Sequence, residues 1–99
     1  MSAYVIFNYD IHNSERWTQY AQVAVPNILA AGGKVLTATH EFATLEGQPQ
    51  PVVVVIEFES MEAAKTWYAS AAYQAIKPLR TESTKGWVLI SPGFTLPTG

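Results

Sequence analysis

The sequence is poor in charged side chains. Of its 99 residues, 6 are Lys or Arg and 8 are Asp or Glu, so that 14% of the chain is charged, whereas an ordinary globular domain has about 25%. The apolar fraction of 48% is typical of a soluble domain. We therefore expect part of the surface to face something other than water.

Three further absences exclude classes of protein. There is no cysteine, so disulfides, thiolate metal sites and a Cys nucleophile are excluded. The basic residues are scattered and the net charge is −2, which argues against a nucleic-acid partner. The longest aliphatic run, 52–56, is too short to span a bilayer, and the N-terminus lacks the basic start of a signal peptide. We expect a cytoplasmic protein without a membrane partner, and the length leaves room for one domain over 1–99.

The periodicity of apolar residues changes along the chain and predicts both strands and helices. Strand-forming residues and turn residues predict strands at 3–9, 34 to about 42, 52–59 and 86–91. Helical spacing and capping residues predict three helices: from Asn13 or Ser14 to Gly32-Gly33, after Ser60, and a short one after Ser70. Proline predicts a kink or break at Pro26 and an interruption or end near Pro78. Residues 92–99 are expected to form an extended tail.

The element order predicts an α+β fold of the ferredoxin-like βαββαβ kind, with an antiparallel sheet of four strands and helices on one face. Successive strand residues point to opposite faces, and in three of the four strands both faces read as largely apolar. The helices can cover only one of these faces. An apolar sheet face left uncovered would be a larger exposed apolar patch than soluble monomers usually have. The sequence therefore predicts a homodimer through the second face, with Phe94 and Leu96 of the tail docking on the partner.

Five segments carry a resemblance to a known family. They are RWTQY, GGKVL, TLEG, VVVIEFES and EAAKTWYASAAYQAIKPLR, and the stretch 57–80 is the most specific of them. Over residues 3–92 the chain resembles the domain-of-unknown-function family 1330, a branch of the dimeric α+β barrel superfamily. The resemblance implies a ferredoxin-like fold, a homodimer built sheet to sheet, and no agreed activity. Relatives in the wider superfamily include cofactor-free oxygenases, lactone isomerases and haem-handling enzymes, so the fold does not choose an activity.

The chain departs from the family pattern in its second strand. Members commonly carry an Arg followed by a Gly pair there, whereas this sequence has Ala38, Thr39 and His40. Any contact of that Arg with an anion is lost in this chain.

The two histidines are the first candidates for proton transfer. His12 follows the first strand and could act as a base, although a solvated loop histidine is the more common case. His40 lies late in the second strand, where it is a candidate for ligand contact. Their spacing matches no zinc motif, so we expect neither a metal site nor a cofactor.

Glu57 and Arg80 are the charged candidates. Alternation places Glu57 beside Val53 and Val55, so a carboxylate ends an apolar strand face. Such a carboxylate either pairs with a cation or has a raised pKa. An ion pair with Arg80 is the favoured hypothesis, and a catalytic role for His12, Glu57 or Arg80 is the alternative.

Aromatic side chains are compatible with a pocket between the helices and the sheet. The tryptophans are first of all core residues, although Trp17 is kept as a ligand contact. A buried tyrosine needs a hydrogen-bond partner, which makes Tyr68 and Tyr73, together with Arg80, the other expected ligand contacts.

Three functions stay open at this point. The first is a dimeric protein that binds a small, mostly apolar molecule in the cleft between sheet and helices. The second is a cofactor-independent enzyme of the oxygenase or isomerase type, with His12 or Glu57 as proton acceptor and Arg80 or a tyrosine polarising an oxygen atom. The third is a purely structural dimer with a filled cleft.

Overall fold

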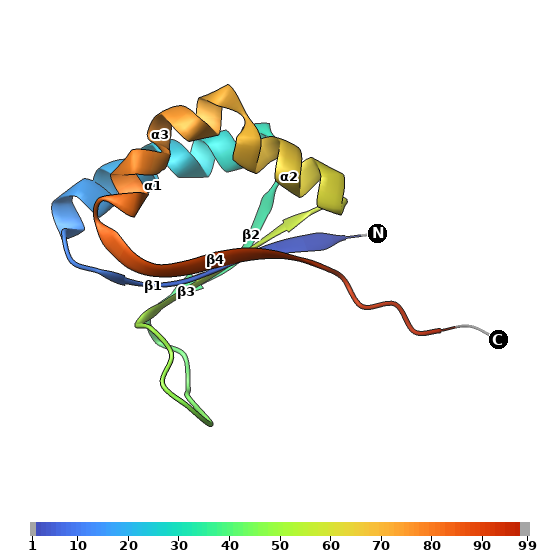
Figure 1. Cartoon of the computed structure of the whole chain (residues 1–99), viewed down its shortest axis with the longest axis horizontal. Coiled ribbons are helices and arrows are strands. Elements are labelled where there is room, and N and C mark those ends of the chain that lie inside the picture. The colour runs from blue at the N-terminus through green and yellow to red at the C-terminus, as the bar shows by residue number, and fades with distance from the viewer. Residues whose placement is uncertain (1, 98–99) are drawn as a thin grey trace.

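The computed structural model describes residues 2–97, and three helices cover one face of a four-stranded antiparallel sheet (Figure 1). The elements in chain order are β1 (Ala3–Ile11), α1 (Ser14–Ala30), β2 (Lys34–Thr39), β3 (Val52–Phe58), α2 (Met61–Ala69), α3 (Ala71–Thr81) and β4 (Thr84–Pro92). The strands lie in the order β2-β3-β1-β4, so that β1 and β3 form the centre of the sheet and β2 and β4, the strands that follow helices, form its two edges. This confirms the predicted ferredoxin-like protomer.

Polar side chains cap all three helices where the sequence predicts them. The side chain of Asn13 accepts a hydrogen bond from the backbone N–H of Arg16 and starts α1. Ser60 and Ser70 accept in the same way from Ala63 and Tyr73, which starts α2 and α3. Each cap satisfies one of the backbone donors that a helix start leaves free.

The prolines interrupt the helices less than predicted. Pro26 lies inside α1 and Pro78 inside α3, and neither breaks its helix. The predicted end near Pro78 is wrong, since α3 continues to Thr81. A proline inside a helix removes one backbone donor and crowds the carbonyl of the preceding turn. Both prolines are exposed, and the buried sides of α1 and α3 pack on the core, which keeps the helical turns around them intact.

The strand ends also differ from the prediction. β2 ends at Thr39 and not near Phe42, after a register shift between Val35 and Thr37 that marks a bulge. β3 ends at Phe58, one residue early, and β4 extends at both ends beyond 86–91. The predicted tail thus starts one residue later, and its last residues, 98 and 99, lie outside the described part of the chain.

The core lies between the helices and one face of the sheet. In the register of the ladders, Val5 lies opposite Ile56 and Ile90, and Phe7 opposite Val54 and Val88. These side chains share the face toward the helices. The buried residues packed there are Val5, Phe7, Tyr9, Tyr20, Ala24, Ile28, Ile56, Phe58, Ala64, Trp67 and Tyr73.

Within residues 2–97 the second face of the sheet carries no helix, and we call it the open face. Its polar side chains include Asn8, Lys34 and Glu57, and its apolar side chains are Tyr4, Ile6, Val53, Val55, Trp87 and Leu89. Trp87 and Leu89 are 49% and 45% exposed. The open face is therefore the uncovered apolar surface that the low charge content predicts.

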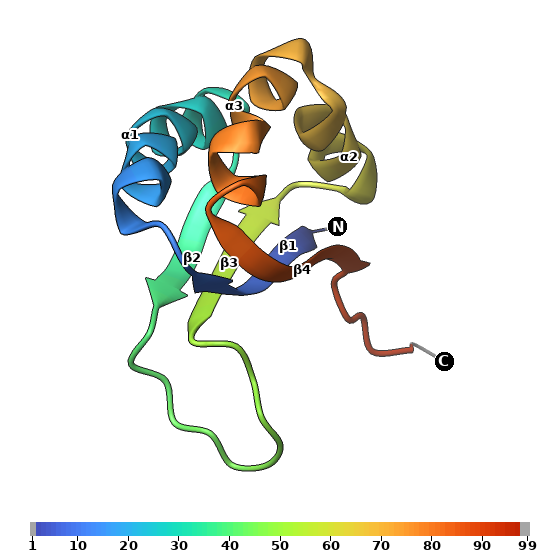
Figure 2. The ribbon, with the colours of Figure 1, turned by 60° about the vertical axis from the view of Figure 1, so that its left-hand side comes forward.

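The connection between β2 and β3 and the tail project from the body of the protein (Figures 1 and 2). The connection, residues 40–51, hangs below the sheet on the side away from the helices. The side chain of Asn8 fixes the end of the connection that leads into β3. Its amide donates to the carbonyls of Gln50 (3.0 Å) and Val52 (2.9 Å) and accepts from the N–H of Gln50. In the tail, Phe94 and Leu96 are 86% and 71% exposed.

Within residues 2–97, no helix is both long and apolar enough to cross a membrane.

Candidate functional site

An apolar hollow lies between α1 and the sheet, and we call it the apolar cleft. It has a volume of about 100 Å³. Its lining residues are Phe7, Tyr9, Trp17, Tyr20, Ala21, Ala24, Val25, Ile28, Val35, Ala38, Val54 and Ile56. The helical spacing that turns one stripe of α1 toward the sheet brings Trp17, Ala21 and Ala24 to its roof. The small alanines leave room that larger side chains would fill.

A second hollow of about 160 Å³ adjoins the apolar cleft and shares Trp17, Ala38 and Val54 with it. His40 lines this outer part. It is exposed and follows β2, which ends about three residues earlier than the sequence predicts, so that His40 lies after the strand and not within it. The structure therefore brings Trp17 and His40, both expected as ligand contacts, to the same hollow.

Tyr9 supplies a polar group to the inner wall of the cleft. Its hydroxyl accepts a hydrogen bond from the indole N–H of Trp17 at 3.0 Å. Burial raises the pKa of Tyr9, although the Trp17 hydrogen bond and the charge of Arg80 act in the opposite direction. The phenol stays protonated at neutral pH, and its O–H makes no hydrogen bond within the described residues. It is free to donate to a ligand.

Behind Tyr9 lies a polar cluster of Arg80, Tyr73, Tyr20 and Tyr68, which we call the arginine–tyrosine cluster. The hydroxyls of Tyr20 and Tyr73 are hydrogen-bonded at 2.7 Å. The Nε–H of Arg80 donates to Tyr73 at 3.3 Å, and one terminal nitrogen donates to Tyr68 at 3.4 Å. The guanidinium also stacks over Phe7, with its carbon 5.1 Å from the ring centre.

The cluster is deeply buried. Tyr73 is completely buried and Arg80 is 7% exposed. Burial, the largest single influence, lowers the pKa of Arg80, but Tyr73, Tyr20 and Tyr68 together raise it above its ordinary value, and the group stays a cation. Burial and the contact with Tyr73 raise the pKa of Tyr20, which keeps it a neutral phenol.

The expected ion pair between Glu57 and Arg80 is wrong. Glu57 lies on the open face, opposite Tyr4 of β1 and Lys34 of β2, whereas Arg80 lies on the helix side of the sheet. The hydroxyl of Tyr4 donates to the Glu57 carboxylate over a long 3.5 Å. Among residues 2–97 the only ion pair is Arg16 with Glu82, at 2.6 Å.

His12 and Glu57 do not lie beside the arginine–tyrosine cluster, as they would have to if they exchanged protons with a molecule bound to it. His12 is exposed in the turn between β1 and α1, and its backbone N–H donates to the carbonyl of Ser83 at 2.9 Å. Glu57 is separated from Arg80 by the sheet. In the part of the chain that the structure describes, no three His, Asp or Glu side chains gather as metal ligands would.

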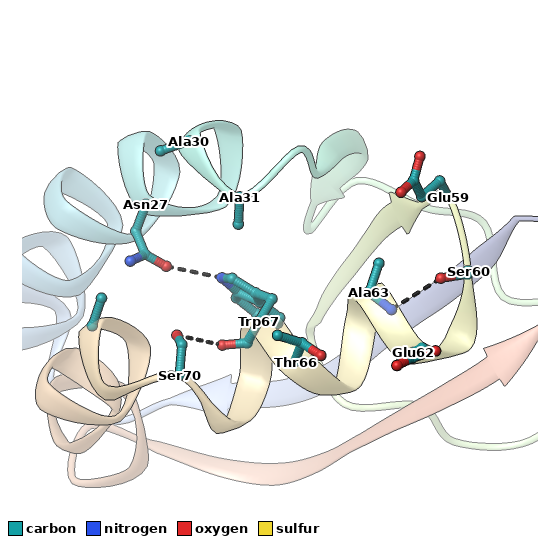
Figure 3. Close-up of a pocket in the computed structure, with 11 residues that line it drawn as sticks. Asn27, Ala30, Ala31, Glu59, Ser60, Glu62, Ala63, Thr66, Trp67 and Ser70 are labelled. Carbon is teal, nitrogen blue, oxygen red and sulfur yellow. Dashed lines mark hydrogen bonds between the residues drawn. The ribbon is translucent and has the colours of Figure 1, made fainter.

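The largest hollow described here, about 640 Å³, is an open groove between the end of α1 and α2 (Figure 3). The indole N–H of Trp67 points across it and donates to the side chain of Asn27 at 2.8 Å. Ser60 and Ser70 are occupied as helix caps. Its polar side chains thus have structural partners, and its two carboxylates, Glu59 and Glu62, are exposed. The groove therefore brings together no set of free polar side chains, among residues 2–97, that could act as a catalytic or binding site.

Sequence reasoning missed three residues that position these sites. Phe7 lies under the guanidinium, Asn27 holds Trp67, and Asn8 fixes the loop before β3. Phe7 reads as an ordinary core residue, so nothing in the sequence marks it. Asn8 stands among apolar residues of β1, and a polar residue inside a strand could have pointed to a side chain that bonds backbone.

Comparison with known proteins places the chain in a family. Residues 2–94 match the family described as a domain of unknown function, DUF1330. The chain belongs to this family. The family assignment and the resemblance read from the sequence agree. No curated protein matches the chain.

Solved structures show the same fold at low sequence identity. A protein of unknown function from Rhodopseudomonas palustris superimposes with a TM-score of 0.77 and 14% identity, over 96% of this chain and 84% of that one. HapK from Hahella chejuensis gives a TM-score of 0.64 and 15% identity, over 100% and 96%. A dimeric protein of unknown function with a ferredoxin-like fold, from Bacteroides fragilis, gives 0.55 and 10%, over 93% and 96%. These three structures are similar to the chain in fold.

Proposed function

We propose that this DUF1330 protein is a homodimer whose protomers each hold a small, mostly apolar molecule in the apolar cleft. The observation that carries the proposal is the lining of the cleft, which is almost entirely apolar and includes Tyr9, whose phenolic O–H donates no hydrogen bond within residues 2–97. Ligand pockets are usually of this kind, apolar with a few polar groups that fix orientation.

The size of the hollows limits the ligand. The inner and outer parts are about 100 and 160 Å³, and an apolar cavity of about 150 Å³ takes up benzene. A ligand of one or two rings fits this space. Its one acceptor, a carbonyl or ether oxygen, would meet the O–H of Tyr9, and its other end would reach Trp17 and His40.

The homodimer is supported by the open face and by a relative. Trp87 and Leu89 are half exposed on a face that no helix covers. The similar Bacteroides fragilis protein is described as dimeric. Burying this face against a second copy removes both apolar surfaces from water and leaves the apolar cleft, on the other side of the sheet, open to ligand.

The ligand proposal is tested by filling the cleft. Ala21 is half-buried in its lining, so Ala21→Leu should place a larger side chain in the ligand space. We use acetophenone, a ring with one carbonyl, as the probe and follow methyl NMR signals of Val54 and Ile56. The wild type should show saturable shifts, Ala21→Leu should lose them, and Tyr9→Phe should weaken binding by about tenfold, the worth of one hydrogen bond.

Ala75→Leu is the matched control, because Ala75 is exposed on α3 and lines no part of the cleft. It should bind the probe like the wild type. The proposal fails if acetophenone and related one- and two-ring ketones leave the methyl signals of the wild type unshifted, or if Ala21→Leu binds them as well as Ala75→Leu does.

A further inference from the structure

Arg80 is a buried cation without a carboxylate partner among residues 2–97. It is 7% exposed, and its hydrogen bonds go only to the neutral hydroxyls of Tyr73 and Tyr68. Removing a cation from water costs several kcal/mol unless an anion compensates it. Phenol hydroxyls and the ring of Phe7 offset part of this cost. The remaining positive charge is uncompensated inside the protein.

Arg80 also lines a hollow of its own, which we call the Arg80 pocket. Its volume is about 290 Å³, and its lining residues are Tyr9, Arg80, Thr81, Thr84, Lys85 and Gly86. It lies where the end of α3 and the start of β4 meet β1. Tyr9 lines both this pocket and the apolar cleft, so the two hollows are neighbours that share this residue.

The pocket is lined by hydrogen-bond donors. A guanidinium has five N–H donors, and only two hydrogen bonds from Arg80 are made within residues 2–97. Within residues 2–97 no nitrogen of Arg80 is both sealed from solvent and without a partner. Its second terminal nitrogen makes no hydrogen bond there and therefore keeps access to solvent, and Arg80 lines the pocket. The hydroxyl of Thr84 donates to the backbone carbonyl of Arg80 at 2.8 Å and ties the strand start to the helix end. Lys85 adds a second cation to the lining.

We propose that the Arg80 pocket binds the carboxylate of a small organic acid. A planar guanidinium can bind a carboxylate through two N–H donors at once, and this pairing is stronger than a hydrogen bond between neutral groups. The binding supplies the anion that the buried cation lacks. The inference does not rest on occupation of the apolar cleft, since the donors involved face a different hollow.

The test is a titration of the intact protein with sodium acetate at constant ionic strength, balanced with chloride. The readout is the Nε–H signal of Arg80 in NMR spectra. Acetate should shift this signal along a saturable curve. Arg80→Lys keeps the positive charge but removes the planar pair of N–H donors that can bind both carboxylate oxygens. Acetate binding, followed through the backbone amide of Gly86, should therefore weaken about tenfold or more. Lys85→Gln should weaken it a few-fold, and Lys34→Gln, on the opposite face, should leave it unchanged.

Several outcomes would overturn the proposal. One is an Nε–H signal that does not respond to acetate. Another is an equal response to acetate, sulfate and phosphate, which would show a general anion effect and not a carboxylate site. If Arg80→Lys does not fold, the wild-type titration and Lys85→Gln still decide the result. Ala21→Leu should bind acetate normally, so failure of the cleft proposal and failure of this one are separately visible.

Discussion

At the scale of single residues, Tyr73 connects the buried polar groups of the protein. Its hydroxyl is shared by Tyr20, at 2.7 Å, and by the Nε–H of Arg80, at 3.3 Å. A buried donor that loses its partner costs the full desolvation of that group. Tyr73 therefore stabilises two other side chains as well as filling space between α3 and the core.

We expect Tyr73→Phe to lower the free energy of unfolding by about 1 to 3 kcal/mol, because it leaves the hydroxyl of Tyr20 and the Nε–H of Arg80 without a partner. Urea unfolding followed by circular dichroism measures the change. Tyr68→Phe is the matched control: Tyr68 also accepts from Arg80, but over 3.4 Å and at a half-buried position. Its loss should stay below about 1 kcal/mol, and equal losses in the two variants would contradict this account.

The charged residues show where residue-level prediction stops. Alternation along β3 correctly places Glu57 with Val53 and Val55, and the helix pattern correctly places Arg80 at the end of α3. The predicted ion pair between the two residues was wrong because the helices, and Arg80 with them, lie on the sheet face opposite to Glu57. Which face a helix covers depends on long-range packing. Of the two tyrosines that accept hydrogen bonds from Arg80, Tyr73 lies seven residues earlier on the same helix, whereas Tyr68 comes from α2 and no local pattern connects it to Arg80.

At the scale of elements, Gly86 sets the pairing of β1 with β4. It lies opposite Tyr9, and a Cβ at this position would come within 2.2 Å of the carbonyl oxygen of Asn8 and 2.5 Å of the Cα of Tyr9. The two backbones approach too closely for any side chain there. This glycine also borders the Arg80 pocket, so the same close approach shapes one of its walls.

Gly86→Ala should destabilise the protein by about 3 kcal/mol, the upper end of the usual cost of overpacking, because the contact is with backbone and not with a flexible side chain. Thermal and urea unfolding measure the loss. The control is Gly47→Ala, since Gly47 has a φ of +80° with nothing near its Cβ position. Only the left-handed backbone opposes alanine there, at about 1 kcal/mol. If Gly86→Ala lowers the free energy of unfolding by no more than Gly47→Ala does, β4 can shift at little cost to accommodate the methyl group, which would contradict this account.

The kinds of element were predictable, and several of their ends were not. The caps Asn13, Ser60 and Ser70 mark helix starts in the sequence because their side chains satisfy backbone donors locally. The end of β2 depends instead on its bulge and on pairing with β3. Whether α3 continues past Pro78 depends on how its buried face packs. Neither is encoded in the neighbouring residues alone.

At the scale of the whole molecule, the protomer has more surface than its size requires. Its accessible surface is 6434 Å², whereas a compact monomer of 10.9 kDa has about 5,600 Å². Its radius of gyration is 14.2 Å, against about 13 Å for a compact domain of 100 residues. The excess surface is on the order of the 800 Å² or so that each partner buries in a standard interface. The projecting 40–51 connection and the tail account for the extended shape (Figure 2).

The low charge content is explained at this scale. The sequence predicted a surface that avoids water, and the open face, with Ile6 and Leu89 as cross-strand neighbours, is that surface. Its partner could not be read from one protomer. In the homodimer that we propose, the open faces pack on each other, and a charge placed there would be desolvated in both copies.

We therefore expect Leu89→Lys to convert the dimer into a monomer, measured by sedimentation at micromolar concentration. Leu89 is 45% exposed in the protomer, so the variant should fold and keep its circular dichroism spectrum. Leu29→Lys is the matched control, because Leu29 is 58% exposed on α1, on the helix side of the protein. It should sediment like the wild type. A wild type that sediments as a monomer would contradict the proposed assembly, and equal dissociation of both variants would place the interface elsewhere than on the open face.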